Sequence, residues 1–383
     1  CYAWEETGVP SAYIEAMNRS LDIVTVISNH VGKILKDNGV YVPISVVGSG
    51  ADHLQRSTRV SSRQWFDGAY GKKAKGFRFL HISSGFPRKG VDLLFKAWSR
   101  LSQQQDWNAS LVIKTFKNPH NNIVQMIEDI QQENSTLAPI VLIEDELQDT
   151  ELLGLYDACD AVVAPSRAEG YGLPLAEAML AGKPVITTAW GGQLDFCSAE
   201  TAWLVDWRFS EAKTHLSIPA SVWAEPILDD LIQQMNVVRN SSAEQLEPRI
   251  KAAQNLLLKQ YTWQQVAQRV DDAITKLKTS SPAKDLALPK IALVSSWGSQ
   301  CGIATYAEAQ VSAIPNSQLY IFANEDAQPL KSDGPRVYRT WRTGLQDDLS
   351  RLGEALLKCD PDVVVFQFNF GFFQIDALGK LIN

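Results

Sequence analysis

The chain has 383 residues, of which 45% are hydrophobic and 21% are charged, as in a globular protein with room for about two or three domains. The formal net charge of -7 and the lack of a long basic run argue against nucleic acid as a partner. No apolar run approaches the ~20 residues of a transmembrane helix, and the polar start of the chain does not predict a signal peptide.

The cysteines and histidines show no paired spacing typical of metal ligands. We therefore expect a reduced, cytoplasmic protein with no bound metal. These residues are Cys1, Cys159, Cys197, Cys301 and Cys359, and His30, His53, His81, His120 and His215.

Residues 1–50 read as the tail of a first lobe. Apolar patterns predict a strand at 21–28, a helix at 28–39 that ends at Gly39, and a strand at 44–47. The chain begins without Met and in the middle of a pattern, so we expect a piece of a longer polypeptide.

Residues 51–277 form the next predicted domain, in which strands and helices alternate. Helical patterns such as 91–101 and 149–159 separate the apolar runs. The strand candidates are 77–83, 110–116, 139–144, 160–165, 184–189 and 201–206. Continuous apolar strands between helices predict an α/β, doubly wound parallel sheet. Ligands bind such sheets at the carboxyl ends of the strands, and Arg88, Glu169 and Gly191 each follow a strand.

Residues 278–289 are rich in Ser, Pro and Lys and read as a linker. Residues 290–383 begin a new α/β pattern, with a strand, a glycine loop and a helix in 290–314 and a buried strand at 361–370. Because exposed apolar strands are costly, we expect residues 1–48 and 290–383 to pack together.

The run PSRAEGYGLPLAEAMLAGKPVIT at 165–187 is the most informative segment. It predicts a strand, a glycine loop and a helix with Pro174 in first position, whose free N–H groups can hold an anion. Glu169 and Glu177 flank that loop, and carboxylates accept hydrogen bonds from vicinal hydroxyls. The predicted ligand therefore has a sugar and a nucleoside on either side of a phosphate.

This run resembles the E-x7-E segment of retaining glycosyltransferases of the GT-B fold, the family 4 or group 1 class. The resemblance implies that Glu169 is catalytic and holds the transferred sugar, while Glu177 holds the ribose. It also places the backbone of Gly170, Tyr171, Gly172 and Leu173 in the donor site. The alternative is an ordinary strand turn with two surface glutamates.

Two further segments resemble donor-binding loops of that family. Arg88 and Lys89 match its basic pair at the diphosphate, although Ser84 stands where many relatives have an arginine; a solvated start of a helix is the alternative. Gly191 and Gly192 match a Gly-Gly pair that faces the ligand, and a tight turn without a ligand role is nearly as well supported.

Gly302 and Ile303 resemble the glycine loop of a GT-B N-terminal lobe, which would make 290–383 the start of a second enzyme in a tandem bacterial polysaccharide glycosyltransferase. The alternative is a plain Rossmann-like βα turn.

The resemblance implies a retaining, metal-independent transfer of a hexose, with mannose favoured, from a nucleoside diphosphate sugar. No further cofactor is expected. The acceptor would be a glycan or a lipid-linked saccharide, as in O-antigen synthesis, with the full-length protein at the inner membrane surface. A non-catalytic nucleotide-sugar-binding module and a GT-B epimerase are the alternatives.

Overall fold

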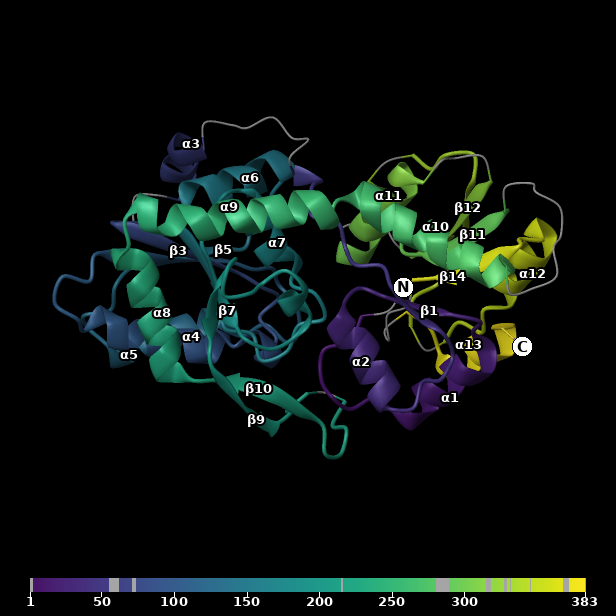
Figure 1. Cartoon of the computed structure of the whole chain (residues 1–383), viewed down its shortest axis with the longest axis horizontal. Helices are drawn as coiled ribbons and strands as arrows, with labels where there is room; N and C mark the ends of the chain where they lie inside the picture. Colours follow the sequence, from purple (N-terminus) through teal and green to yellow (C-terminus); the bar gives the residue numbers. More distant parts are fainter. Residues whose placement is uncertain are drawn as a thin grey trace. The chain divides into compact units, whose positions relative to one another are not determined.

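The computed structural model describes residues 3–54, 62–70, 74–214, 216–279, 289–299, 301–314, 318–326, 329–330, 332–344, 346–367 and 372–382. These residues form two compact units (Figure 1). Unit 1 comprises Cys1–Trp4, Val9–Gly50 and Tyr261–Asn383, and unit 2 comprises Glu5–Gly8 and Ala51–Gln260.

Unit 2 contains a six-stranded, fully parallel sheet in the order β5-β4-β3-β6-β7-β8. Its strands are β3 (Phe77–Ile82), β4 (Ala109–Lys114), β5 (Ile140–Ile143), β6 (Ala161–Ala164), β7 (Val185–Thr188) and β8 (Trp203–Val205). All six predicted strands are confirmed; each is slightly shorter than predicted, and β4 begins one residue earlier, at Ala109. Every residue of β6 and β7 is buried, as expected for strands that are covered on both faces.

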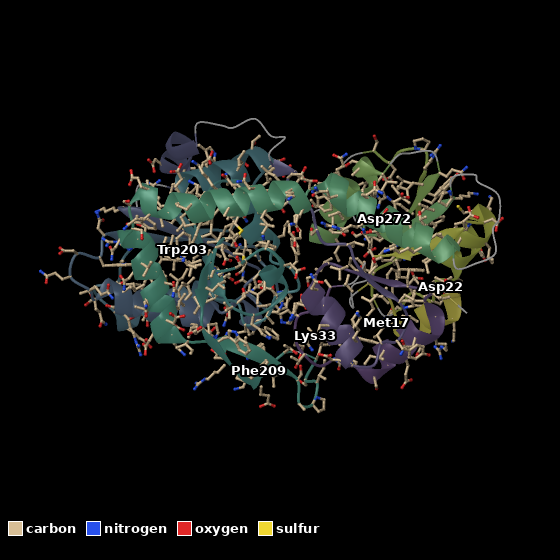
Figure 2. All side chains as sticks on the ribbon, viewed as in Figure 1. Met17, Asp22, Lys33, Trp203, Phe209 and Asp272 are labelled. Carbon is tan, nitrogen blue, oxygen red and sulfur yellow. The ribbon has the colours of Figure 1, made fainter. Side chains whose placement is uncertain are left out.

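Helices cover both faces of this sheet (Figure 1). On one face α4 (Val91–Ser102) packs against α5 (Ile123–Glu133) and α8 (Leu228–Asn240). On the other face α3 (Ser62–Ala69) packs on α6 (Asp149–Ala158), and α7 (Leu173–Leu180) packs on α9 (Ala243–Gln260). Trp203, labelled in Figure 2, is buried in the core between the sheet and α8. The predicted doubly wound sheet is therefore confirmed.

An antiparallel hairpin of β9 (Trp207–Glu211) and β10 (Val222–Pro226) follows the sheet. We did not predict it from the sequence. The alternation of aromatic and polar residues from Trp207 to Glu211 is nevertheless the period-2 signal of a half-buried strand.

Unit 1 contains two parallel sheets. The first pairs β1 (Val24–Val26) with β2 (Ile44–Val46), and the second has the order β13-β12-β11-β14. The bounds are β11 (Ile291–Ser295), β12 (Leu319–Asn324), β13 (Val337–Trp341) and β14 (Val363–Phe366). The helices are α1 (Ser11–Ser20), α2 (Asn29–Asp37), α10 (Trp263–Thr279), α11 (Gly302–Ala313), α12 (Ser350–Cys359) and α13 (Ile375–Ile382).

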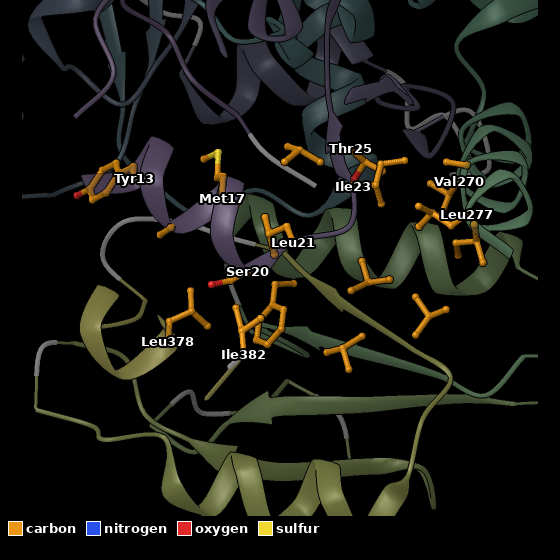
Figure 3. Close-up of a pocket in the computed structure, with 18 of the residues that line it drawn as sticks. Tyr13, Met17, Ser20, Leu21, Ile23, Thr25, Val270, Leu277, Leu378 and Ile382 are labelled. Atoms are coloured by element: carbon orange, nitrogen blue, oxygen red, sulfur yellow. The ribbon is translucent and has the colours of Figure 1, made fainter. Parts of the chain in front are cut away.

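The two end segments of the chain pack together in unit 1, as we expected. Val47 lies in one apolar cluster with Ile291 and Val363, and α1 packs on α13. An apolar cavity of about 140 Å³ lies in the same unit, lined by α1, β1, α10, β14 and α13 (Figure 3). Residues 280–288 of the predicted linker at 278–289 lie outside the described residues.

One prediction in unit 1 needs correction. The run at 361–370 was expected to be a buried strand, but β14 lies at the edge of its sheet and Val364 is 37% exposed. An edge strand has a neighbour on one side only, so part of its apolar surface stays open. Residues 368–370 of that run lie outside the described residues.

Within the described part of the chain, no helix has the length and apolar character needed to cross a membrane.

Candidate functional site

The segment that joins β6 to α7 carries both predicted glutamates. Residues 165–172 are all buried, and Gly172 adopts the left-handed conformation, with φ 91°, where α7 begins. Pro174 is the second residue of α7, one place later than we predicted. The free N–H groups of the first turn of α7 therefore lie at the carboxyl edge of the sheet, where an anion can bind.

Glu169 is 7% exposed and is held by a cation. Lys89 Nζ donates a hydrogen bond of 2.6 Å to Glu169 Oε1, and Ser166 Oγ donates to the same oxygen at 2.8 Å. Burial lowers the pKa of Lys89. Burial also acts to raise the pKa of Glu169, but the charges of Lys89 and Arg88 outweigh it and hold that pKa below its ordinary value. The lowered pKa of Glu169 keeps its carboxylate charged near neutral pH.

Arg88 is the second cation of the site and is 24% exposed at its side chain. Its guanidinium lies 3.7 Å from Glu169 Oε2 and 3.2 Å from Glu5 Oε1. Arg88 and Lys89 lie in a 3-10 helix, Pro87–Lys89, and Gly90 ends it in the left-handed conformation. A Cβ on Gly90 would lie 2.0 Å from the carbonyl oxygen of Pro165, so the two loops can approach this closely only with glycine there.

His81 lies on β3 and holds the neighbouring segments in place through its two ring nitrogens. Its Nδ1 lies 2.9 Å from the carbonyl oxygen of Val163, and its Nε2 lies 2.8 Å from Ser83 Oγ. A carbonyl can only accept, so Nδ1 carries the proton and Nε2 accepts from Ser83. Complete burial lowers the pKa of His81 to about 4, so the ring is neutral and positions the loop without adding charge.

Glu177 is 7% exposed, and both of its oxygens are engaged. His53 Nε2 lies 3.1 Å from Oε1, and the Tyr156 hydroxyl donates to Oε2 at 2.7 Å. Burial acts to lower the pKa of His53, but its bond to Glu177 and the nearby carboxylates raise it overall. Burial raises the pKa of Tyr156 well above its ordinary value, so its hydroxyl stays protonated as a donor. The alternative of two surface glutamates is wrong, because both side chains are buried.

Gly191 and Gly192 close the site at the end of β7. The N–H of Gly192 donates to the carbonyl oxygen of Glu169 at 2.7 Å. Gly191 has φ 120°, and a Cβ there would lie 2.4 Å from Gln193 Oε1 and 3.2 Å from the Glu169 carbonyl oxygen. The structure thus joins Arg88, Glu169 and the Gly-Gly turn in one place, as their positions after neighbouring strands predicted.

Arg167 holds the loops behind the site. Its guanidinium pairs with Asp92 at 2.7 Å and Glu225 at 2.6 Å, donates to the carbonyl oxygen of Pro87, and lies over the ring of Trp223. Burial acts to lower the pKa of Arg167, but the two carboxylates raise it overall. Because both carboxylates pair with its guanidinium, Arg167 holds these loops together.

Gly302 and Ile303 open α11 in unit 1, as predicted for a strand, glycine loop and helix. The Cys301 side chain caps this helix by accepting from the N–H of Ala304 at 3.3 Å. That Gly302 and Ile303 face a ligand stays a prediction.

Sequence reasoning missed His53, Tyr156, Ser166 and Glu5 as members of the site. Ser166 lies inside the informative run, three residues before Glu169, and its hydroxyl was a readable signal. The others are distant in the sequence, and no local pattern marks them. No group of three His, Cys, Asp or Glu residues that could hold a metal is found in the part of the chain that the structure describes.

Residues 63–213 match the family model of glycosyl transferases group 1. Two curated relatives align over 30% of this chain: an MMP alpha-(1->4)-mannosyltransferase of Mycolicibacterium hassiacum, 31% identical, and an uncharacterized glycosyltransferase of Methanocaldococcus jannaschii, 32% identical. The aligned region spans only 26% and 29% of those proteins. The family match and these relatives show that this part of unit 2 is similar to glycosyl transferases of group 1.

Solved structures share the fold at low sequence identity. A sucrose-phosphate synthase from Thermosynechococcus elongatus is 18% identical with a TM-score of 0.56, over 70% of this chain and 62% of that one. A glycosyltransferase from Rickettsia africae is 16% identical with a TM-score of 0.58, over 72% and 69%. Anabaena HepE, solved with UDP and glucose, is 17% identical with a TM-score of 0.52, over 70% and 66%. The predicted GT-B fold is thereby confirmed.

Proposed function

We propose that the protein is a retaining, metal-independent glycosyltransferase that moves a hexose from a nucleoside diphosphate sugar to a glycan or lipid-linked acceptor. The observation that carries the proposal is the cluster of Arg88, Lys89 and Glu169 at the carboxyl edge of the sheet. Mannose is the favoured sugar, in line with the mannosyltransferase relative.

The cations and the start of α7 would stabilise the departing diphosphate. When the bond between the anomeric carbon and the phosphate oxygen breaks, its electron pair stays on the diphosphate, where negative charge grows. Fixed positive groups aimed at that charge lower the barrier without reorganisation. The ammonium of Lys89 has three N–H donors, so it can bind a phosphate oxygen while it remains bonded to Glu169. These protein groups supply the positive charge in our metal-independent proposal.

Glu169 would hold the transferred sugar. Ser166 and Lys89 both donate to Oε1, whereas Oε2 lies 3.7 Å from the Arg88 guanidinium and can accept from sugar hydroxyls. Its depressed pKa keeps it an acceptor at neutral pH. As sugar and diphosphate separate, a carboxylate here also stabilises positive charge on the sugar ring.

Glu177 would bind the ribose of the donor. His53 and Tyr156 fix its carboxylate in one orientation, and each of its oxygens retains a lone pair for a ribose hydroxyl. Gly170, Tyr171, Gly172 and Leu173 would contribute backbone, and Gly191 and Gly192 would face the sugar. Anabaena HepE was solved with UDP and glucose, which supports a nucleotide sugar as the ligand.

We further propose residues 1–50 as the end of one acceptor lobe, 51–277 as the donor lobe and 290–383 as the start of another acceptor lobe, with Gly302 and Ile303 in its loop. A tandem polysaccharide glycosyltransferase would have this order. Its lipid-linked acceptor would bring the full-length protein to the inner, cytoplasmic surface of the membrane.

The test begins with binding to the 383-residue chain. A thermal-shift panel of GDP-mannose, UDP-glucose, GDP and UDP should show stabilisation by at least one nucleotide sugar beyond its bare nucleotide. Transfer is then assayed on the full-length polypeptide, with the anomeric configuration of the product read by NMR. An inverted product contradicts the retaining assignment. Binding without transfer or hydrolysis by the full-length protein would assign a binding module instead.

A further inference from the structure

Three aromatic side chains form an open cluster beside the candidate site in unit 2. Trp207 and Phe209 lie on β9 with ring centroids 4.7 Å apart, and Trp190 follows β7 with its ring 6.1 Å from each of them. Phe209 is 56% exposed, and both tryptophans are half-buried. We call Trp190, Trp207 and Phe209 the aromatic platform; Figure 2 labels Phe209 on the hairpin.

The platform is continuous with the site. Trp190 directly precedes Gly191, and it packs on an apolar cluster that contains Ala168, the neighbour of Glu169. The N–H of Gly192, two residues after Trp190, donates to the Glu169 carbonyl oxygen. Trp190 is therefore anchored on both sides to the loop that carries Glu169.

A hydrogen bond and ring contacts hold the platform together. Trp207 Nε1 donates to the carbonyl oxygen of Ala189 at 2.8 Å, which ties its ring to the segment before Trp190. The neighbouring rings meet at 70° and 88°, the edge-to-face arrangement that aromatic pairs prefer. Rings that are already fixed lose little conformational entropy when a ligand binds them.

The surroundings of the platform favour a sugar over an apolar protein surface. Glu211, which is exposed, lies two residues after Phe209 and on the same face of β9. The core of a protein interface is depleted of charged residues, whereas a pyranose has an apolar C–H face bounded by hydroxyls. Aromatic rings fit the C–H face, and the Glu211 carboxylate on the same face of β9 can accept hydrogen bonds from the hydroxyls.

We propose that the aromatic platform is a carbohydrate-binding subsite that holds a pyranose unit of the acceptor glycan next to the donor site. This inference rests on the proposed transferase function for the choice of ligand, and it deepens that function by assigning residues of unit 2 to the acceptor. The side chain to test is Phe209. It is 56% exposed, so its removal should destabilise the fold little.

The experiment measures binding of α-1,2-mannotriose and of maltotriose to the 383-residue chain by saturation-transfer NMR, with titrations for Kd. The wild type should saturate ring C–H protons of at least one trisaccharide. Phe209→Ala should weaken its binding by about fivefold, and Phe209→Tyr, which keeps the ring, should restore it. Leu258→Ala is the matched control, since Leu258 is 47% exposed on α9, across unit 2 from the hairpin (Figure 1).

Nucleotide binding, measured on the same samples by calorimetry, separates the two proposals. A wild type that binds UDP or GDP but neither trisaccharide overturns the platform and leaves the donor site standing. Equal trisaccharide binding by wild type and Phe209→Ala overturns it as well. Self-association that disappears in Phe209→Ala, seen by sedimentation, would assign the platform to a second copy of the chain instead. Trisaccharide binding without nucleotide binding would sink the proposed function alone.

Discussion

Lys89 and Glu169 lie 80 residues apart in the chain, and their charged groups meet at 2.6 Å. Each follows a strand of the same parallel sheet, and the two strands, β3 and β6, are neighbours. The sheet thus brings a cation and a carboxylate together at its carboxyl edge, and burial strengthens their interaction.

Removing either member of this pair should destabilise unit 2. Lys89→Met leaves Glu169 with a buried charge beside Arg88 at 3.7 Å and Ser166 at 2.8 Å, and breaking a buried pair costs about 3–5 kcal/mol. The double variant Lys89→Met/Glu169→Gln removes both charges and should be less destabilised than the sum of the single variants. Urea unfolding of all four proteins measures this double-mutant cycle; strictly additive losses would show that the pair is not coupled.

The two glutamates should separate nucleotide binding from sugar binding. In the proposed site Glu177→Ala removes an acceptor for ribose hydroxyls, so the binding free energy of UDP or GDP should weaken by about 1.5–3 kcal/mol. Glu169→Ala should reduce binding of the intact nucleotide sugar and its transfer more than binding of the bare nucleotide. Calorimetry with both ligands tests this, and equal losses for both ligands in both variants would refute the assignment.

Arg167 should be important for stability, in contrast to a surface arginine. Arg167→Met leaves Asp92 and Glu225 without their shared cation, and we expect a loss of about 3–5 kcal/mol. The matched control is Arg100→Met, which breaks an exposed pair with Asp229 and should cost no more than about 1 kcal/mol. Similar unfolding midpoints for the two variants would contradict the structural role of Arg167.

His53 should make stability depend on pH. Its folded pKa lies above the ordinary value of 6.5, because the carboxylates of Glu177, Asp149 and Asp52 outweigh burial. A raised folded pKa means that the stabilisation is complete below 6.5 and is lost as pH rises through the folded value. The difference in the free energy of unfolding between wild type and His53→Gln should therefore fall as the pH rises from 6.5 through the folded pKa of His53. A difference that stays constant or grows with pH in urea titrations argues against the His53–Glu177 pair.

Removal of divalent metal should leave activity intact. Arg88, Lys89 and the start of α7 supply the positive charge that the departing diphosphate needs in the proposed reaction. Transfer by the full-length protein is measured before and after EDTA treatment, with Mg²⁺ and Mn²⁺ added back. An absolute requirement for either ion would contradict the metal-independent assignment.

Local sequence pattern predicted most of the fold and the centre of the site. Strands that are covered on both faces appear as continuous apolar runs, which is why β3 to β8 were found close to their actual bounds. The glycines and Pro174 marked the loop before α7 through the backbone conformations that they permit. Since parallel strands end at one edge, Arg88, Glu169 and Gly191 could be grouped from their positions alone.

Only the tertiary structure decided which groups touch. His53 and Tyr156 reach Glu177 from segments 124 and 21 positions away in the numbering, and no local periodicity records such a meeting. The direct hydrogen bond between Lys89 and Glu169 likewise depends on how closely their two loops approach each other. That approach is possible because Gly90 has no side chain to meet the carbonyl oxygen of Pro165. Sequence patterns report the burial and backbone conformation of a residue, whereas the charge state and hydrogen bonds of a side chain depend on partners that packing brings to it.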